Sequence, residues 1–337
     1  MTHPVTLGVI GAGRIGRMHA EHLAYRIPGA RLVAVADVIV EAARQCAAAC
    51  GAARAVQDYR EILDDPAIEG VLICSATPTH ARIIGEAAAA GKHIFCEKPI
   101  ALNLPDIDHA LDAVARAGVT LQIGFNRRFD ANFQRVRQAI AREEIGQPHL
   151  LHITSRDPAP PPLDYIRDSG GIFLDMTIHD FDMARFLIGS EITEVYATGD
   201  VRVDPAIGAA GDLDTAVVLL KFADGTIGTI NNSRRAVYGY DQRAEVFGSG
   251  GMIAIGNDYP NTAQISTGAN VGRDLPQNFF LDRYTESYIA EVRAFCHAVR
   301  ADEPPPVTGN DGRIAVVLGM AARQSYAENR PVRVALA

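Results

Sequence analysis

Residues 5–16 read VTLGVIGAGRIG, an apolar run that leads into a G-x-G-x-x-G pattern. The run Val5–Gly11 predicts a buried β-strand, and the spacing of Arg14–Tyr25 predicts a helix after it. In such a unit the three glycines permit a tight turn, close approach of a diphosphate, and close packing of helix on strand. The helix N-terminus offers N–H groups to the phosphates. The stretch therefore predicts a dinucleotide site, and the alternative is a turn with a structural role only. The expected site residues are Gly11, Gly13, Arg14, Ile15 and Gly16.

An acidic residue, Asp37, ends the next apolar run, Arg31–Asp37. A carboxylate at this point accepts hydrogen bonds from the adenosine ribose and repels a 2′-phosphate. The residues after it, Val38–Val40, include no Arg or Lys that would hold such a phosphate. The pattern therefore favours NAD over NADP. An Asp that only caps the next helix would leave that preference open.

The first part of the chain alternates apolar runs with helical periods. Further runs are Val71–Ala76, His93–Cys96 and Thr120–Gly124, and the helical segments are Val40–Cys50, Thr79–Ala90 and Pro105–Ala117. Strands that are apolar throughout are typical of a parallel sheet covered on both faces. We therefore expect an α/β, doubly wound Rossmann domain over residues 1–124.

The pattern changes after Phe125. The expected helices are Ala131–Arg142, Asp175–Ile188, Arg283–Arg300 and Gly309–Glu328, and the expected strands are Glu194–Val203, Thr215–Ala223, Thr226–Arg234, Ala244–Gly248 and Met252–Gly256. The pairs Asp224-Gly225 and Gly250-Gly251 predict hairpin turns between neighbouring strands. Residues 125–337 are thus predicted to form an α+β domain with an open, mainly antiparallel sheet.

Composition limits the classes of function. A chain of 337 residues with 48% hydrophobic and 21% charged residues is typical of a two-domain globular protein. The net charge of −8 argues against nucleic acid as the main partner. No apolar run reaches ~18 residues and no secretory signal is visible, so we expect no membrane span. Five scattered cysteines, with no ligand set around Cys46 and Cys50, favour a cytoplasmic protein without a metal.

The triplet Glu97-Lys98-Pro99 follows the apolar run His93–Cys96. It falls at the carboxyl end of the expected sheet, where ligands of such domains bind. Proline restrains the backbone of Lys98 and so fixes its direction. An ammonium group there can hold a substrate hydroxyl and stabilise a forming alkoxide. The alternative is a surface lysine paired with Glu97.

A second stretch, GGIFLDMTIHD at residues 170–180, carries Asp175 and His179 four residues apart. On one helix this spacing puts both side chains on one face. A carboxylate that holds one ring nitrogen fixes the tautomer and leaves the other nitrogen to accept a proton. An ordinary helix pair is the alternative. A metal site is disfavoured because no third ligand and no H-E-x-x-H pattern is present.

These three motifs, in this order and spacing, make the chain resemble the glucose–fructose oxidoreductase/inositol dehydrogenase (Gfo/Idh/MocA) family over essentially its whole length. Residues 124–130 (GFNRRFD), 175–180 and 238–241 (YGYD) are most similar to the inositol 2-dehydrogenases within that family. The resemblance implies NAD-dependent oxidation of a ring secondary alcohol of inositol to the ketone. It also implies a dimer or tetramer assembled through the open sheet, with Thr215–Arg234 as the expected interface.

The resemblance also implies roles for single residues. His179 would remove the hydroxyl proton, Asp175 would orient His179, and Lys98 would bind the reacting oxygen. Arg127 and Tyr238 would hold other ring hydroxyls, and Asp157 is a further candidate for that task. The cofactor-side residues would be Thr77, Pro78 and His80 near the nicotinamide, Glu97 near the ribose, and Lys98.

Alternatives stay open for several of these residues. Arg127 and Arg128 can pair with acidic neighbours such as Asp130, and Tyr238 and Tyr240 can be exposed interface residues. His19, in the first helix, is interpreted as structural.

The function itself has two alternatives. One is a dehydrogenase of another cyclic polyol or sugar, such as scyllo- or chiro-inositol or an aldose, with NAD or NADP. The other is a non-catalytic dinucleotide-binding sensor. The presence of Lys98, Asp175 and His179 together argues against the sensor.

Overall fold

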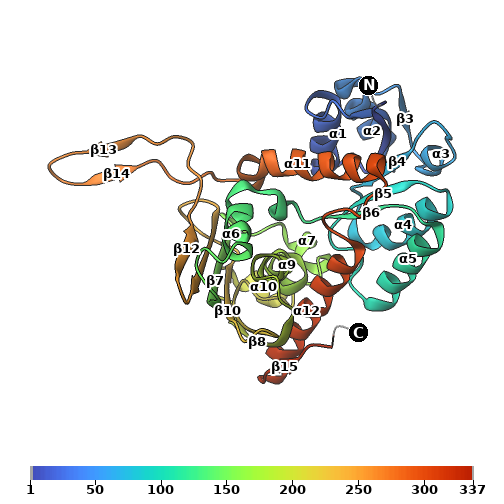
Figure 1. Cartoon of the computed structure of the whole chain (residues 1–337). Coiled ribbons are helices and arrows are strands. Elements are labelled where there is room, and N and C mark those ends of the chain that lie inside the picture. The colour runs from blue at the N-terminus through green and yellow to red at the C-terminus, as the bar shows by residue number, and fades with distance from the viewer. Residues whose placement is uncertain (1–2, 336–337) are drawn as a thin grey trace. The chain divides into compact units, whose positions relative to one another are not determined.

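The computed structural model describes residues 3–335 (Figure 1), which form two compact units. Unit 1 contains the residues up to Asn126 and residues 286–316, and unit 2 contains residues 127–285 and those from Val317 onward. The predicted division placed everything after residue 124 in the second domain. The segment 286–316 differs because Ile289, Val292 and Phe295 lie in the buried core of the first sheet.

Unit 1 is the predicted Rossmann domain, and this prediction is confirmed. Its sheet has the order β3-β2-β1-β4-β5-β6, and all neighbouring strands are parallel. The strands are β1 (Val5–Ile10), β2 (Ala30–Ala36), β3 (Arg54–Val56), β4 (Gly70–Ile73), β5 (His93–Glu97) and β6 (Leu121–Gly124). The helices are α1 (Arg14–Tyr25), α2 (Val40–Cys50), α3 (Arg60–Leu63), η1 (Thr77–Thr79), α4 (His80–Ala89) and α5 (Leu104–Ala117). The short strand β3 was not predicted.

The strands of this sheet are buried on both faces. Every residue of β1, β4 and β6 is buried, and Figure 1 shows α1 and α2 on one side of the sheet and α4 and α5 on the other. The strand order reverses between β1 and β4. In open α/β sheets this reversal leaves a crevice at the carboxyl ends of the strands, where ligands bind. The glycine loop after β1 lies at that point.

Unit 2 is built around a seven-stranded sheet with the order β12-β11-β7-β10-β9-β8-β15. Its strands are β7 (Pro148–Arg156), β8 (Ile192–Asp200), β9 (Thr215–Phe222), β10 (Ile227–Ser233), β11 (Asp241–Gly248), β12 (Gly251–Ile255) and β15 (Val332–Arg333). Its helices are η2 (Asn126–Phe129), α6 (Ala131–Ala141), α7 (Leu163–Asp168), α8 (Ile172–Asp175), α9 (Thr177–Ile188) and α10 (Pro205–Ala209). The long helices α11 (Phe280–Ala301) and α12 (Gly309–Glu328) each have residues in both units.

The predicted hairpins are confirmed. Asp224-Gly225 joins β9 to β10, with Gly225 at a φ of +92°, and Gly251 pairs with Gly248 where β11 turns into β12. The sheet is mainly antiparallel, as predicted, but β7 runs parallel to β10 in its middle. Hairpin signals report only strands adjacent in the chain, and β7 pairs with β10 and β11, which lie far along the sequence.

One face of this sheet is covered by α9, which packs on β7 and β10, and the opposite face carries the exposed side chains. A separate two-stranded arm, β13 (Gln264–Ser266) with β14 (Val271–Arg273), extends from the end of β12 in Figure 1. No helix among residues 3–335 is both long enough and apolar enough to cross a bilayer.

Candidate active site

The glycine loop between β1 and α1 has the shape that a diphosphate requires. Gly11 has a φ of +100°, and a Cβ there would lie 2.7 Å from the backbone of Cys74 and Ser75. A Cβ at Gly16 would lie 1.8 Å from the carbonyl oxygen of Gly11, so only glycine lets α1 start so close to the loop. At Gly13 a Cβ would meet nothing within 4 Å. Gly13 caps α1 without a side-chain hydrogen bond, which leaves the first N–H groups of α1 for a phosphate.

Asp37 connects the end of β2 to this loop. Its Oδ2 accepts a hydrogen bond from the Ala12 N–H at 2.7 Å, and its Oδ1 accepts one from the Ile39 N–H at 2.8 Å. Each carboxylate oxygen keeps a further lone pair for a ribose hydroxyl. The next side chains, Val38 and Ile39, are exposed and apolar, so these two positions offer no charge to a 2′-phosphate. These residues fit NAD.

Replacing Asp37 with Ala is expected to lower the preference for NAD over NADP about 10- to 100-fold. The change removes a charged hydrogen-bond acceptor for the ribose, worth about 1.5–3 kcal/mol, and it removes the repulsion of a 2′-phosphate. Steady-state kcat/KM with each cofactor gives the ratio. The values of kcat/KM with NAD and with NADP can both fall, because the loop loses its bonds from Ala12 and Ile39. The ratio of the two values therefore reports the cofactor preference. An unchanged ratio would place the selectivity elsewhere.

Glu97 and Lys98 lie at the carboxyl edge of the sheet, as predicted from the position of their triplet after β5. Glu97 Oε1 lies 2.8 Å from His19 Nε2. The side chain of Lys98 is partly buried, and the Lys98–Pro99 peptide bond is cis. His19 has a structural contact, in agreement with its interpretation from the sequence.

Three predicted nicotinamide-side residues follow β4. Thr77 and Pro78 begin η1, and the side chain of Pro78 is exposed. His80 is buried, and its two ring nitrogens lie 2.8 Å from the Pro99 carbonyl oxygen and 2.9 Å from that of Ser75. Because both nitrogens face backbone carbonyls, His80 braces the segment around Pro99 and offers neither nitrogen to the cofactor. That the His80 ring lies beside the nicotinamide stays a prediction.

Asp175 and His179 lie on two successive helices of unit 2. Asp175 ends α8, Met176 separates the helices, and His179 belongs to the first turn of α9. The prediction of one continuous helix over Asp175–Ile188 is therefore wrong. The Thr177 hydroxyl, in the first residue of α9, donates to Asn232 Oδ1 on β10 at 2.7 Å and so ties the start of α9 to the sheet.

Both oxygens of the Asp175 carboxylate have partners. Oδ1 accepts a hydrogen bond from the Tyr165 hydroxyl at 2.8 Å, and Oδ2 lies 3.1 Å from Arg234 Nη1. Arg234 is buried and also reaches Asp212 at 3.2 Å. Burial and the charge of Asp175 raise the pKa of Tyr165, so its hydroxyl stays a donor.

The sequence analysis missed Tyr165, Arg234 and Asp212. The available signal was a pair of arginines, Arg234-Arg235, at the end of a predicted strand. A buried arginine at such a position needs acidic partners, and the structure supplies two of them.

Asp157 lies next to this group, at the carboxyl ends of the parallel strands β7 and β10. Its N–H donates to the Ser233 carbonyl oxygen at 3.0 Å, and its own carbonyl oxygen accepts from the Ala236 N–H at 2.6 Å. Burial, and then the negative charge of Asp175, raise the pKa of Asp157 to about 6, although Arg234 acts in the opposite direction. A carboxyl group with such a shifted pKa is a candidate for binding or proton transfer.

Arg127 is buried beneath this region and has an acidic partner. Its Nη1 lies 2.6 Å from Asp180 Oδ1, and Asn232 Nδ2 donates to the other oxygen of Asp180 at 2.8 Å. Arg127 therefore pairs with an acidic residue, as the alternative interpretation predicted, but the partner is Asp180. Asp130 instead caps α6. Arg128 makes the matching pair with Asp182 at 2.6 Å.

The Tyr238 hydroxyl has two polar partners. Its hydroxyl donates to Asp241 Oδ2 at 2.6 Å and accepts from Arg156 Nη1 at 3.1 Å. Arg156 also contacts Asn231, whose neighbour Asn232 points to the opposite face, where α9 lies. Alternation along β10 therefore puts Tyr238 on the outer face of the sheet. That Tyr238 holds a hydroxyl of the substrate stays a prediction.

Residues 5–125 match a family described as oxidoreductase family, NAD-binding Rossmann fold, and residues 133–254 match the GFO/IDH/MocA C-terminal domain. The chain is 51% identical to myo-inositol 2-dehydrogenase of Thermotoga maritima, covering 97% of this chain and 98% of that protein. It is 48% identical to inositol 2-dehydrogenase of Rhizobium meliloti, covering 98% and 99% respectively.

The crystal structure of scyllo-inositol dehydrogenase from Lactobacillus casei, with bound NAD(H) and scyllo-inositol, matches with a TM-score of 0.91 and 30% identity. The match covers 98% of this chain and 99% of that one. The matches to both parts of the chain thus agree with the Rossmann unit, its glycine loop and Asp37, and with the second unit described above. The chain therefore belongs to the Gfo/Idh/MocA oxidoreductase family, and its cofactor is NAD.

Proposed function

We propose that this protein oxidises a ring secondary alcohol of inositol to the ketone with NAD, as a myo-inositol 2-dehydrogenase does. The observation that carries the proposal is the likeness over nearly the full length of both chains, at 51% and 48% identity, to relatives named for that reaction.

The proposed proton acceptor is His179. Its imidazole takes the proton of the reacting hydroxyl, and Asp175 orients the ring. The structure adds partners for Asp175, because Arg234 and the Tyr165 hydroxyl hold its two oxygens. Arg234 and Tyr165 are thus proposed as positioning residues for Asp175.

The proposed role of Lys98 is to hold the reacting oxygen. Its ammonium group stabilises the negative charge that develops as the hydroxyl proton leaves. NAD supplies the hydride acceptor, so the carbon–hydrogen electron pair leaves the ring carbon and a carbon–oxygen double bond forms. Asp157 is proposed to bind another ring hydroxyl, and Arg127, paired with Asp180, is proposed to position that part of unit 2.

The cofactor is proposed to lie along the carboxyl edge of the first sheet. Gly11, Gly13, Arg14, Ile15 and Gly16 would hold its diphosphate at the start of α1. Asp37 would accept from the adenosine ribose, and Glu97 from the second ribose. Thr77 and Pro78 would lie beside the nicotinamide.

The test is NAD reduction by the purified protein across a panel of inositol isomers, cyclic polyols and aldoses. Fast turnover of myo-inositol at modest concentration is expected. Turnover of scyllo-inositol alone would retain the mechanism and change the substrate, an alternative favoured by the match to a scyllo-inositol dehydrogenase. Bound NAD with no turnover of any member would contradict the proposal and favour a binding function.

The open face of the second sheet is proposed to join copies of this chain into a dimer or tetramer. Exposed apolar side chains line this face of β7, β9, β10, β11 and β12, namely Leu150, Val217, Leu219, Ile227, Phe247 and Met252. The interface predicted from the resemblance, Thr215–Arg234, contains three of these six. A contiguous apolar patch of this kind on one sheet face is typical of an interface.

Replacing Leu219 with Asp is expected to reduce the assembly to smaller species, because a charge would then be buried in that interface without a partner. Light scattering coupled to size-exclusion chromatography measures the mass directly. The matched control, Leu219→Met, keeps an apolar side chain of similar volume and is expected to keep the mass. An unchanged mass for Leu219→Asp would show that the assembly does not use this face.

The cytoplasm is the proposed location. All five cysteines lie among the described residues, and none of them forms a disulfide. Free buried thiols are typical of proteins from reducing compartments.

A further inference from the structure

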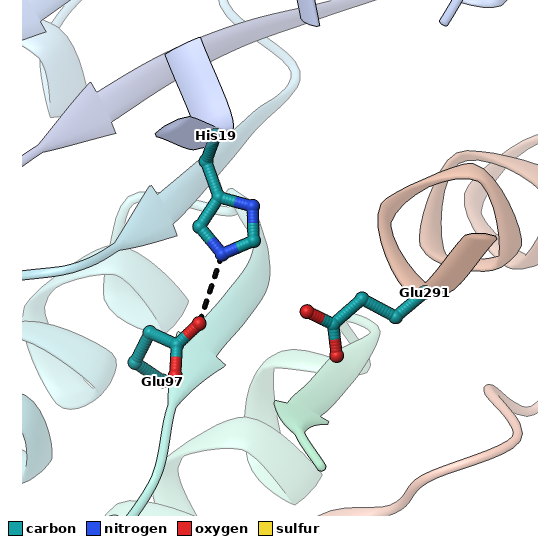
Figure 2. A group of neighbouring side chains, drawn as sticks. All are labelled: His19, Glu97 and Glu291. Atoms are coloured by element: carbon teal, nitrogen blue, oxygen red, sulfur yellow. Dashed lines mark hydrogen bonds and ion pairs between the residues drawn. The ribbon is translucent and has the colours of Figure 1, made fainter. Parts of the chain in front are cut away.

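Three titratable side chains of unit 1 converge at the residue that precedes Lys98 (Figure 2). His19 comes from α1, Glu97 from the end of β5 and Glu291 from α11. One nitrogen or oxygen atom from each lies within 4.8 Å of the others. Figure 2 shows the Glu291 carboxyl group pointing from α11 toward the His19–Glu97 pair. The function proposed above uses neither His19 nor Glu291.

The Glu97 carboxylate is held on two sides. His19 Nε2 lies 2.8 Å from Oε1, so an imidazole N–H donates to the carboxylate. Gly124 pairs with Glu97 across the sheet, and a Cβ there would lie 3.2 Å from the carboxyl atoms. The side chain of Glu97 is still 13% exposed. Its second oxygen therefore remains able to accept a hydrogen bond from a ligand.

Glu291 is in a different situation. Its side chain is fully buried, and neither of its carboxyl oxygens has a hydrogen-bond partner within the part of the chain that the structure describes. Val292 and Phe295 on the same helix belong to the apolar core. An ionised carboxylate here would face a second carboxylate across a few ångströms of low-dielectric core, which is strongly unfavourable.

A proton on Glu291 removes this conflict. Burial, and then the charge of Glu97, hold the pKa of Glu291 well above its ordinary value of 4.5. Other titratable groups near the cluster include Tyr288, whose ring lies edge-on to that of His19 with centroids 5.8 Å apart, and His22, whose pKa is lowered to about 4 by burial and then by the charge of His19. Burial raises the pKa values of the Cys74 and Cys96 thiols well above the ordinary thiol range. Both thiols therefore stay neutral.

We propose that Glu291 is kept as a neutral carboxylic acid and that His19 and Glu291 are positioning residues for Glu97. A neutral Glu291 does not repel the Glu97 side chain from its place beside His19. His19 occupies one oxygen and leaves the other for a ribose hydroxyl of NAD. The inference rests on the proposed placement of Glu97 beside the cofactor ribose.

The first test compares the melting temperatures of the wild type and Glu291→Gln between pH 5 and pH 8. Above pH 4.5 the unfolded wild type releases a proton that the folded protein keeps, so its stability falls as pH rises toward the folded pKa. Glutamine is neutral and has nearly the same shape, so the variant lacks this fall. The melting temperature of the variant minus that of the wild type is therefore expected to increase by about 5 °C or more from pH 5 to pH 8.

The matched control is Glu286→Gln, the same change on the same helix at a side chain that is 78% exposed. The difference in melting temperature between Glu286→Gln and the wild type is expected to stay constant with pH. A constant difference for Glu291→Gln as well would show that Glu291 is ionised, and would overturn the proposal. A wild-type melting temperature lowered by EDTA, but unchanged by EDTA in Glu291→Gln, would overturn it in favour of a bound cation.

The second test measures NAD affinity by calorimetry in His19→Ala and His19→Gln. Loss of the donor to Glu97 is expected to weaken NAD binding about tenfold in His19→Ala, since one charged hydrogen bond is lost. The amide N–H of His19→Gln is expected to restore affinity to within about threefold of the wild type. Equal affinities of the two variants would overturn the positioning role.

NAD binding requires no substrate, so these measurements stay decisive even if no inositol is turned over. If Glu291→Gln fails to fold, the infrared spectrum of the folded wild type at pH 8 answers the same question. A carbonyl band of a protonated carboxylic acid that disappears on unfolding is expected. Its absence in the folded protein would overturn the proposal.

Discussion

Replacing Lys98 with Ala is expected to lower kcat for inositol oxidation at least about 10³-fold while NAD binding survives. The ammonium group is proposed to stabilise negative charge that exists only as the alkoxide forms, and loss of one such preorganised donor typically costs about 10²–10³ in rate. Loss of the oxygen-binding contact itself adds to this. The cofactor keeps its own contacts, because the glycine loop and Asp37 are held by bonds that do not involve Lys98.

The experiment measures stopped-flow NADH formation and calorimetric NAD affinity for Lys98→Ala and Lys98→Met. Methionine keeps most of the length of the side chain without the charge, so both variants are expected to be equally slow. Recovery of turnover in Lys98→Met would show that the bulk of the side chain matters and its charge does not. Near-normal turnover of Lys98→Ala would refute the proposed mechanism.

Replacing His179 with Ala is expected to lower kcat about 10²–10⁴-fold, the usual contribution of a positioned general base. Imidazole added to the assay is expected to restore part of the lost rate, because a small base can occupy the space of the missing ring. The concentration dependence of that rescue is the measurement. NAD affinity should not change, since His179 has no proposed contact with the dinucleotide.

The control for this experiment is Asp175→Asn in the presence of the same imidazole. Its His179 ring is still present, so added imidazole is not expected to accelerate it. A His179→Ala variant that stays inactive at every imidazole concentration, while Asp175→Asn retains most of its activity, would remove His179 from the role of base.

Most of the fold could be predicted from local sequence signals. The glycine loop, the apolar runs of the first half and the hairpin turns at Asp224-Gly225 and Gly250-Gly251 each act within a few residues. The placement of α11 in unit 1 could not be predicted, because it depends on Ile289 and Phe295 finding a core formed by strands that begin at Val5. The parallel pairing of β7 with β10 likewise depends on strands far apart in the chain.

The candidate site divides in the same way. The sequence indicated Asp37, Lys98, Asp175 and His179 from motifs, but it did not show which partners hold them. Arg234 reaches Asp175 across 59 positions, and Asp180 reaches Arg127 across 53. The partners of Tyr238, Arg156 and Asp241, could not be predicted, because a loop residue cannot be placed on one face of a sheet before the register is known.

The sequence by itself thus determined the family, the NAD cofactor and the chemical groups available, because these depend on short motifs whose backbone geometry is local. Only the tertiary structure decided which charges are buried and what neutralises them. The pairs Arg234–Asp175 and Arg127–Asp180, and the contact of His19 with Glu97, join segments that meet only after folding. Burial makes an unpaired charge costly, and the partner that removes the cost is set by the packing of distant elements.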